Sequence, residues 1–285
     1  MSTPTAKTWC SALASCVFAI LGGAVVPAHA QSLQQSCGID GSGFEAWLSQ
    51  FKAAAVSQGV SPATAASALA NVSYDPNTIR LDRSQRSFKL TFEQFYAKRV
   101  SPSLISRGQR HMQTHAQLLG NIEKRFGVPG SVLVAIWGLE TNYGADGNGG
   151  KSILGSLATL AYDCRRAEFF RNELVNALRI VDRRDMSADQ LRGGWAGEIG
   201  PMQFLPSSYV KYAVDFDGDG RKDLMRSIPD MLASTANYLK SFGWVAGQGW
   251  QPGTANYAVI QQWNKAEVYA QTIAIMAAKL GGRDG

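Results

Sequence analysis

Apolar residues recur at helical spacing along most of the chain, and the strict alternation typical of strands is scarce. Capping and turn residues such as Gly127 and Pro129 mark where successive helices end and begin. The predicted helices cover residues 44–58, 62–69, 101–126, 153–162, 167–181, 228–242 and 267–280, together with one that starts at Pro129. The pattern therefore predicts a mainly α protein.

Residues 1–30 form an apolar stretch of a different kind. Lys7 is the only charged residue in it, and it ends in Ala28-His29-Ala30, the small-x-small pattern of a signal-peptidase site. We expect this leader to be removed and the mature protein to be periplasmic. Cleavage before Cys16 is an alternative, but apolar sequence continues well past that residue. No later apolar run approaches the ~20 residues needed to cross a bilayer.

The net charge of the chain narrows the range of possible binding partners. The net charge is +6 for the whole chain, and loss of Lys7 with the leader leaves +5. Such a basic protein suits a polyanion, either a nucleic acid or a cell-wall polymer. No basic stripe with interleaved aromatic residues is evident, and export favours the wall. We therefore expect no nucleic-acid partner.

Removal of the leader leaves two cysteines, Cys37 and Cys164. An even pair in an oxidising compartment favours one disulfide. Two unlinked thiols, too distant to bridge, are the alternative.

Glu140 is the main candidate for acid chemistry. It follows the apolar stretch 132–136, and in a helix it shares a face with Leu133, Ile136 and Trp137. Burial without a cationic partner raises the pKa of a carboxyl group, which can then hold a proton near neutrality and donate it. The alternative is a carboxylate that points into water past the helix end or pairs with an arginine.

Two weaker motifs suggest other chemistry. Residues 145–152 fit a phosphate loop if Ala145 replaces the first Gly, which would indicate a nucleotide-binding protein. The segment does not directly follow a strand, so we expect a loop bordering a cleft. His111 and His115 have a spacing that could bind a metal, but they lack the Glu and the third ligand of a zinc motif. We expect a packing or surface role for both.

A carboxylate-rich segment begins at Asp215. Oxygen-bearing side chains occupy loop positions 1, 3, 5 and 9, with Gly220 at position 6, as in an EF-hand calcium loop. Arg226 stands at position 12 in place of the usual Glu, so we expect Asp230 to close the site. The predicted metal-binding residues are Asp215, Asp217, Asp219, Arg221 and Asp230. We expect structural Ca²⁺ here, and no organic cofactor; a plain Asp-Gly turn is the alternative.

Residues 194–209 combine glycines, a glutamine and aromatic rings. Glycines allow a ligand to approach the backbone, and Gln203 can both donate and accept hydrogen bonds. Trp195, Phe204 and Tyr209 offer faces on which sugar rings can stack. The segment therefore suggests a glycan site, with a structural turn between helices as the alternative.

Many of these segments together resemble the lytic murein transglycosylase B family, which has a goose-lysozyme-like helical core. The matches run in family order between about Phe95 and Leu280. The matching segments are residues 127–129, 139–144, 157–160, 165–170, 200–209, 214–220, 236–239 and 243–244. Many ordered matches are more specific than any one of them.

The resemblance implies a lysozyme-like helical domain with an additional helical N-terminal region and a small EF-hand-like loop insertion. The expected organisation is a signal peptide at 1–30 and a transglycosylase catalytic domain at 31–285. Within that domain, residues 31–128 would form the N-terminal helical part and residues 129–285 the lysozyme-like core, with the calcium loop at 215–230.

The resemblance also implies an activity. Glu140 corresponds to the catalytic acid and base of a lytic transglycosylase. This enzyme cleaves the β-1,4 bond between N-acetylmuramic acid and N-acetylglucosamine in peptidoglycan without water, and it leaves 1,6-anhydromuramic ends. The expected substrate-binding residues are Gln203, Phe204, Arg165, Arg166, Asn264 and Tyr209. We expect a monomer that binds glycan strands, with proteins of the cell-wall machinery as candidate partners.

Three residues depart from the family pattern. Gly194 replaces a Ser that can bond the catalytic carboxyl, and Trp263 replaces a Tyr beside Asn264. Glu198 stands where a small residue is common. We expect Glu198 to be a solvated loop charge; the alternative is a second carboxylate that positions a water. A hydrolytic muramidase and a non-catalytic glycan-binding protein therefore stay as alternative functions.

Overall fold

The structure is a computed structural model that describes residues 37–84, 90–146 and 150–282. The predicted leader, residues 1–30, lies outside this part, as do residues 147–149 of the segment that resembles a phosphate loop. None of the helices in the described part is both long enough and apolar enough to cross a membrane.

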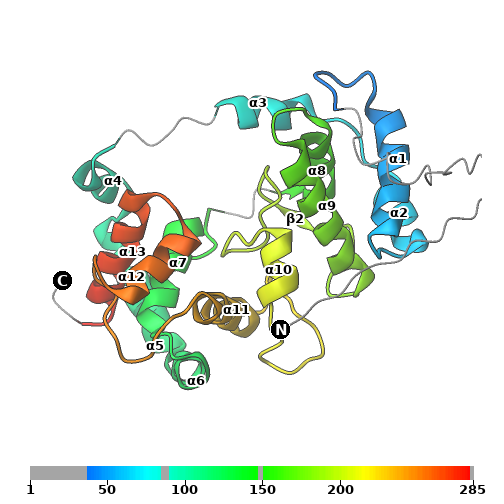
Figure 1. Ribbon diagram of the computed structural model, residues 1–285. Helices are drawn as coiled ribbons and strands as arrows, with labels where there is room; N and C mark the ends of the chain where they lie inside the picture. Colours follow the sequence, from blue (N-terminus) through cyan, green and yellow to red (C-terminus); the bar gives the residue numbers. More distant parts are fainter. Residues whose placement is uncertain (1–36, 85–89, 147–149, 283–285) are drawn as a thin grey trace, which may run out of the picture. The chain divides into compact units, whose positions relative to one another are not determined.

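Helices dominate the described residues, as Figure 1 shows, and the predicted mainly α class is confirmed. They are α1 (Phe44–Ser57), α2 (Pro62–Ala68), α3 (Pro76–Ser84), α4 (Phe92–Arg99), α5 (Pro102–Thr114), α6 (Ala116–Phe126), α7 (Gly130–Thr141), α8 (Ile153–Tyr162), α9 (Ala167–Asp182), α10 (Pro206–Tyr212), α11 (Ile228–Ser241), α12 (Ala255–Trp263) and α13 (Glu267–Leu280). The strands β1 (Lys151–Ser152) and β2 (Arg192–Gly193) form one short antiparallel pair.

Most predicted helices are present, with two kinds of difference. The stretch 101–126 forms two helices, α5 and α6, which meet at His115. The helices α3, α4, α10 and α12 lie outside the predicted ranges. Each has nine residues or fewer, and such lengths give a periodic pattern too few repeats to be recognised.

The helix that carries Glu140 lies inside the protein. Helix α7 packs against α5, α6, α11 and α13, and every one of its residues except Glu140 is buried. Helical spacing predicts Glu140 on one apolar face, but the whole helix is enclosed, as expected for a helix without a polar face. Glu140, at the end of the helix, is therefore the one residue of α7 that is only partly buried.

A second set of helices packs around α8 and α9. Helices α1 and α3 contact α8, whereas α2 and α10 contact α9. Aromatic rings fill the space beside α1, where Phe44 and Trp47 each lie 5.6 Å from the ring of Tyr162. The first helices of the chain thus pack on α8 and α9, while α5 and α6 pack on α7.

The predicted disulfide between Cys37 and Cys164 is present. It joins the segment before α1 to the loop between α8 and α9, across 127 positions of the sequence. The same loop carries Arg165 and Arg166, so the disulfide helps to position them.

Candidate active site

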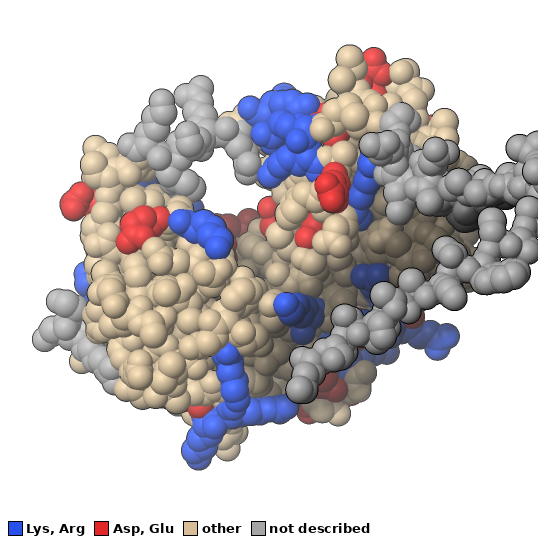
Figure 2. All heavy atoms as spheres, viewed as in Figure 1, with Lys and Arg blue, Asp and Glu red and all other residues tan. Residues whose placement is uncertain are grey.

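A cavity of about 410 Å³ lies at the end of α7. Its lining residues are Glu140, Glu198, Gln203, Phe204, Leu205, Ser208, Tyr238, Gln262, Trp263 and Asn264. They come from α7, from the loop between β2 and α10, and from α10, α11 and α12 with its following residue. Figure 2 shows a hollow on this face, between the part that carries α12 and α13 and the part that carries β2 and α10. The cavity brings residues from four distant segments together.

Glu140 is held from one side by Trp263. The indole Nε1 donates a hydrogen bond of 2.9 Å to Oε1 of Glu140. The hydroxyl of Tyr269 is buried close to the same carboxylate, without a hydrogen bond of normal geometry. Arg99 is the nearby cation, and it donates to the backbone carbonyl of Leu139. The immediate hydrogen-bond donor of Glu140 is therefore neutral.

These surroundings set the pKa of Glu140. Burial raises it above the ordinary range, and the negative charge of Glu198 raises it further. The indole of Trp263, the Tyr269 hydroxyl and the charge of Arg99 act in the opposite direction, but the net pKa is raised. A carboxyl of this kind can hold a proton at neutral pH and give it to a group in the cavity.

Trp263 was identified in the sequence only as a departure from a family pattern. In the structure its ring both bonds Glu140 and packs edge-on against Phe204, with ring centroids 5.4 Å apart. The sequence signal available was its position next to Asn264, which also lines the cavity. An indole N–H is a donor only, so it can hold the carboxyl without competing for its proton.

Glu198 lies in the cavity with Glu140, and the expectation of a solvated loop charge is wrong. Its side chain is partly buried, and Oε2 accepts a 3.0 Å hydrogen bond from the backbone N–H of Ala196. Burial raises the pKa of Glu198, while the backbone donors and the charge of Arg166 act against the rise. The site thus contains two carboxyl groups.

Three of the predicted substrate-binding residues line the cavity: Gln203, Phe204 and Asn264. Gln203 has a positive φ of 55° and its Nε2 donates to the carbonyl of Gly200 at 2.8 Å, which fixes the side chain. Oδ1 of Asn264 accepts from the N–H of Ala266 at 3.0 Å. Both amides are held by local backbone and present their remaining groups to the cavity.

The other three predicted substrate-binding residues have different contacts. Tyr209 is only 1% exposed and its hydroxyl donates to the carbonyl of Lys222, so a sugar ring cannot stack on it. Arg165 and Arg166 both donate to the carboxylate of Asp82 on α3. None of the three lines the cavity, although the charge of Arg166 reaches Glu198.

The histidine pair and the lysine of the segment that resembles a phosphate loop contact other protein residues. The rings of His111 and His115 stack on each other at 5.7 Å, and His111 lies 4.5 Å from the ring of Trp137. This agrees with the expected packing role. Lys151, the lysine of the segment that resembles a phosphate loop, forms a 2.7 Å ion pair with Asp75.

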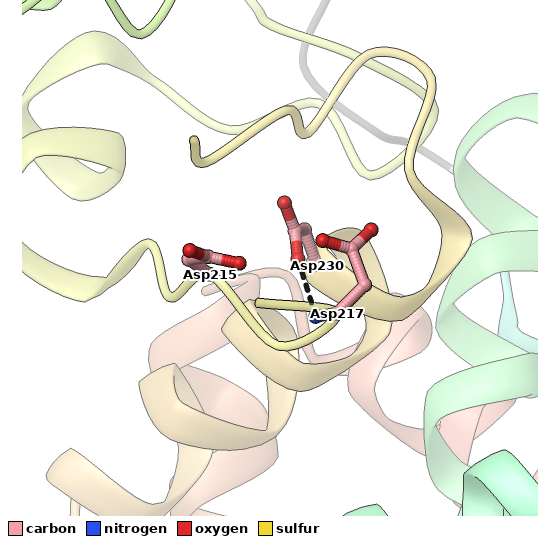
Figure 3. Close-up of side chains that lie close together, drawn as sticks. All are labelled: Asp215, Asp217 and Asp230. Carbon is pink, nitrogen blue, oxygen red and sulfur yellow. Dashed lines mark hydrogen bonds between the residues drawn. The ribbon is translucent and has the colours of Figure 1, made fainter. Parts of the chain in front are cut away.

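The predicted calcium loop brings three carboxylates together. One oxygen each of Asp215, Asp217 and Asp230 lies within 4.8 Å of the others; Asp215 and Asp217 come from the loop and Asp230 from the first turn of α11 (Figure 3). Asp230 is fully buried, and it accepts hydrogen bonds from the N–H groups of Phe216 and Asp223. Burial raises its pKa. Converging oxygen ligands of this type fit a hard cation such as Ca²⁺.

Asp219 and Arg221 differ from this prediction. Asp219 is not part of the carboxylate cluster, and its Oδ1 accepts from the backbone N–H of Arg221 at 2.8 Å. The Arg221 residue is exposed. The cluster in the structure is therefore made of three of the predicted side chains, with Asp230 in the closing position.

Comparison with known proteins agrees with this geometry. Residues 43–255 match the family described as the transglycosylase SLT domain. The chain belongs to the transglycosylase SLT domain family. The sequence motifs predicted a mainly α, lysozyme-like fold and the lytic murein transglycosylase B group of this family. Both predictions are confirmed.

Individual members of the SLT domain family show how close the relationship is. Membrane-bound lytic murein transglycosylase B of Escherichia coli is 37% identical over 167 residues, which is 56% of this chain. The match spans 46% of the length of that relative. SltB3 from Pseudomonas aeruginosa, solved in complex with NAG-anhNAM-pentapeptide, is 32% identical with a TM-score of 0.78, covering 84% of this chain and 80% of SltB3.

A more distant structure shares the fold. The E. coli lytic transglycosylase Slt35, solved in complex with calcium, is 24% identical with a TM-score of 0.71. The match covers 88% of this chain and 97% of Slt35.

Proposed function

We propose that this protein is a lytic transglycosylase that cleaves the β-1,4 bond between N-acetylmuramic acid and N-acetylglucosamine in peptidoglycan. The observation that carries the proposal is Glu140, a carboxyl of raised pKa that lines a cavity at the end of a buried helix. Membership in the SLT domain family supports it. SltB3 was solved with NAG-NAM-pentapeptide, which supports a glycan strand bearing peptides as the substrate.

In the proposed reaction Glu140 acts twice. It first protonates the oxygen of the leaving sugar, while the acetamido group of the muramic acid stabilises the cation at C1. It then takes the proton of the 6-hydroxyl of the same sugar as that oxygen attacks C1 and closes the 1,6-anhydro ring. One carboxyl serves both steps, as in other substrate-assisted exceptions to the two-carboxylate scheme. Trp263, which packs against Phe204, orients the carboxyl, and Gln203 and Asn264 hold the glycan in the cavity.

Product analysis tests the proposal. The protein is incubated with purified sacculi and the released fragments are analysed by mass spectrometry. We expect anhydromuramic ends, which are one water lighter than reducing ends. Glu140→Gln should lower the rate at least ~10³-fold, because it removes both the acid and the base. Glu168→Gln, on an exposed position of α9, is the matched control.

Each competing function predicts a different result. Mainly reducing ends would indicate a hydrolytic muramidase. Binding of sacculi without any cleavage would indicate a non-catalytic glycan-binding protein. Unchanged activity of Glu140→Gln would show that another residue is the acid.

We further propose that Asp215, Asp217 and Asp230 hold a structural Ca²⁺. The calcium complex of Slt35 supports this assignment, as does the convergence of three carboxylates that would otherwise repel one another. The ion would fix the loop before α11 and take no part in the chemistry. A chelator should lower the melting temperature by about 5 °C, since loss of a bound ion removes its contribution to the folded state. Asp230→Asn should abolish this shift and Asp219→Asn should retain it.

We also propose that the protein is exported to the periplasm. The small-x-small pattern that ends at Ala30 supports a periplasmic protein that begins at Gln31. The disulfide between Cys37 and Cys164 supports an oxidising compartment. N-terminal sequencing of the protein purified from cells should identify Gln31 as the first residue, whereas a chain starting at Met1 would contradict export by cleavage.

A further inference from the structure

The carboxylate of Glu198 occupies a space that exists because residue 194 has no side chain. A Cβ atom added at Gly194 would lie 2.1 Å from Oε2 of Glu198, far inside the contact distance. Gly194 does not have a positive φ, so its backbone conformation does not require glycine. The same Oε2 is anchored by the N–H of Ala196, and the N–H of Gly194 donates to the carbonyl of Glu198. The turn 194–198 thus holds a carboxylate against the cavity.

Among the described residues, the carboxylate of Glu198 accepts hydrogen bonds only from backbone N–H groups, and the side chain lines the same cavity as Glu140. The carboxylate is therefore fixed by backbone and faces a cavity that can hold a ligand. A carboxylate oxygen accepts hydrogen bonds and donates none when ionised. A carboxylate in this place suits an N–H or O–H group of a substrate.

The two carboxyl groups of the cavity have different neighbours. The groups around Glu140 are the indole of Trp263, the Tyr269 hydroxyl, the charge of Arg99 and the carboxylate of Glu198. Around Glu198 are backbone N–H donors and, at longer range, the charge of Arg166. Two like charges in one enclosure disfavour joint ionisation, so one group keeps a proton. Burial raises the pKa of both groups, and at Glu198 the backbone N–H donors act against that rise.

We propose that Glu198 is a second catalytic carboxylate, which accepts a hydrogen bond from the acetamido N–H of the reacting sugar and stabilises the cation formed there. This inference rests on the proposed function. It explains why a carboxylate is held beside Glu140 in an enclosure where, without such a task, two acids would be unfavourable.

Glu198 neither gains nor loses a proton in the proposed reaction. The acetamido carbonyl oxygen bonds to C1 as the bond from C1 to the leaving oxygen breaks, and that oxygen receives the proton of Glu140. The positive charge now lies on a ring that includes the acetamido nitrogen, whose N–H faces the carboxylate of Glu198. The 6-hydroxyl oxygen then bonds to C1, the bond from C1 to the acetamido oxygen breaks, and the hydroxyl proton goes to Glu140. Water takes no part.

The first test is Glu198→Gln. The amide oxygen of Gln can still accept from Ala196, so the turn is kept while the charge is lost. We expect kcat on soluble glycan fragments to fall about 100-fold, as when a group that stabilises developing charge is removed, with KM changed less than about threefold. A residue that only closes the turn would leave kcat unchanged, and an unchanged kcat overturns the proposal.

The second test moves the carboxylate without removing it. Gly194→Ala places a Cβ where Oε2 now lies, so it should displace Glu198 and lower kcat to a similar extent. The double variant Gly194→Ala, Glu198→Gln should be no slower than either single variant, because both remove the same interaction. If the loss of kcat in the double variant equals the product of the two single losses, the two substitutions do not act through the same interaction. Gly120→Ala, on α6 with open space around its Cβ, is the control and should keep full activity.

Failure of this inference is distinguishable from failure of the proposed function. If the unmodified protein releases anhydromuramic ends, Glu140→Gln is inactive, and Glu198→Gln and Gly194→Ala are both fully active, then only the role of Glu198 is wrong. If Glu198→Gln removes reducing-end products alone, then Glu198 activates water and the acetamido assignment is overturned. If the unmodified protein cleaves nothing, the proposed function itself fails.

Discussion

Glu140 and Asp82 are both shielded carboxyl groups, and their pKa values shift in opposite directions. Burial acts to raise the pKa of each. Asp82 is 2% exposed, yet its pKa is lowered, because hydrogen bonds and charges from Arg165 and Arg166 outweigh burial. Glu140 accepts from the neutral indole of Trp263, and its pKa is raised.

The comparison shows that the donor, more than the depth, decides what a carboxyl group does. Arg83, Arg165 and Arg166 surround Asp82, and Arg83 also bonds Asp163, so this cluster ties α3 to the loop before α9. Its carboxylate is kept ionised and structural. At the end of α7 the donors are weaker and a cavity is open, which leaves a carboxyl that can exchange a proton.

The largest expected effect comes from removing the disulfide, which should destabilise the protein and leave the activity of the cavity at α7 unchanged. Cys164 directly precedes Arg165, and the bond closes a long loop in the unfolded chain. Cys37→Ser should lower the free energy of unfolding by about 3 kcal/mol, measured in urea. Because the cavity at α7 does not include this loop, kcat should stay within about twofold of the unmodified protein. A large loss of kcat in the folded variant would show that the two regions are coupled.

Removing the Asp82 charge is expected to have the next largest effect. Asp82→Asn leaves three arginines without their shared partner, and it should cost about 2 kcal/mol, a value reduced because these arginines are partly exposed. Glu140→Gln should not destabilise the protein, because it removes a carboxyl that burial disfavours. Thermal unfolding measures both, with Asp189→Asn on the surface as control. Equal destabilisation by Asp82→Asn and Glu140→Gln would contradict the expected difference between the two carboxyl groups.

The smallest effect is the pH dependence of these stability differences, on the order of 1 kcal/mol. The folded-state pKa of Glu140 is raised, so the unmodified protein loses stability relative to Glu140→Gln as pH rises above 4.5, the ordinary value. Asp82 has a lowered pKa, so its contribution is present above 3.8 and is lost as pH falls through the folded value below that. Urea unfolding between pH 3 and pH 8 should give slopes of opposite sign for the two variants. Slopes of the same sign would contradict the opposite shifts.

Local sequence determined the parts of the fold that depend on neighbours a few positions apart. Helical spacing placed Glu140 on a helix, Gly127 marked the end of α6 and Pro129 marked the start of α7. The Asp-Gly pattern located the loop that begins at Asp215, and the count of cysteines predicted the disulfide. These features rest on periodicity, capping and turn chemistry, which act over a turn or two of chain.

Tertiary packing decided which side chains meet. Trp263 lies 123 positions from Glu140, and its place beside Asn264 was the only sign in the sequence that it lies near the carboxyl group that it bonds. Glu198 looked like a surface charge because a turn places no limit on where its side chain points, and the neighbouring glycine directs it into the cavity. Arg165 and Arg166 matched a groove motif, yet Asp82 on α3 is their partner. The sequence by itself therefore determined most of the helices and the family and singled out Glu140 as the candidate acid, whereas the environment that sets the pKa of Glu140 arose only from long-range packing.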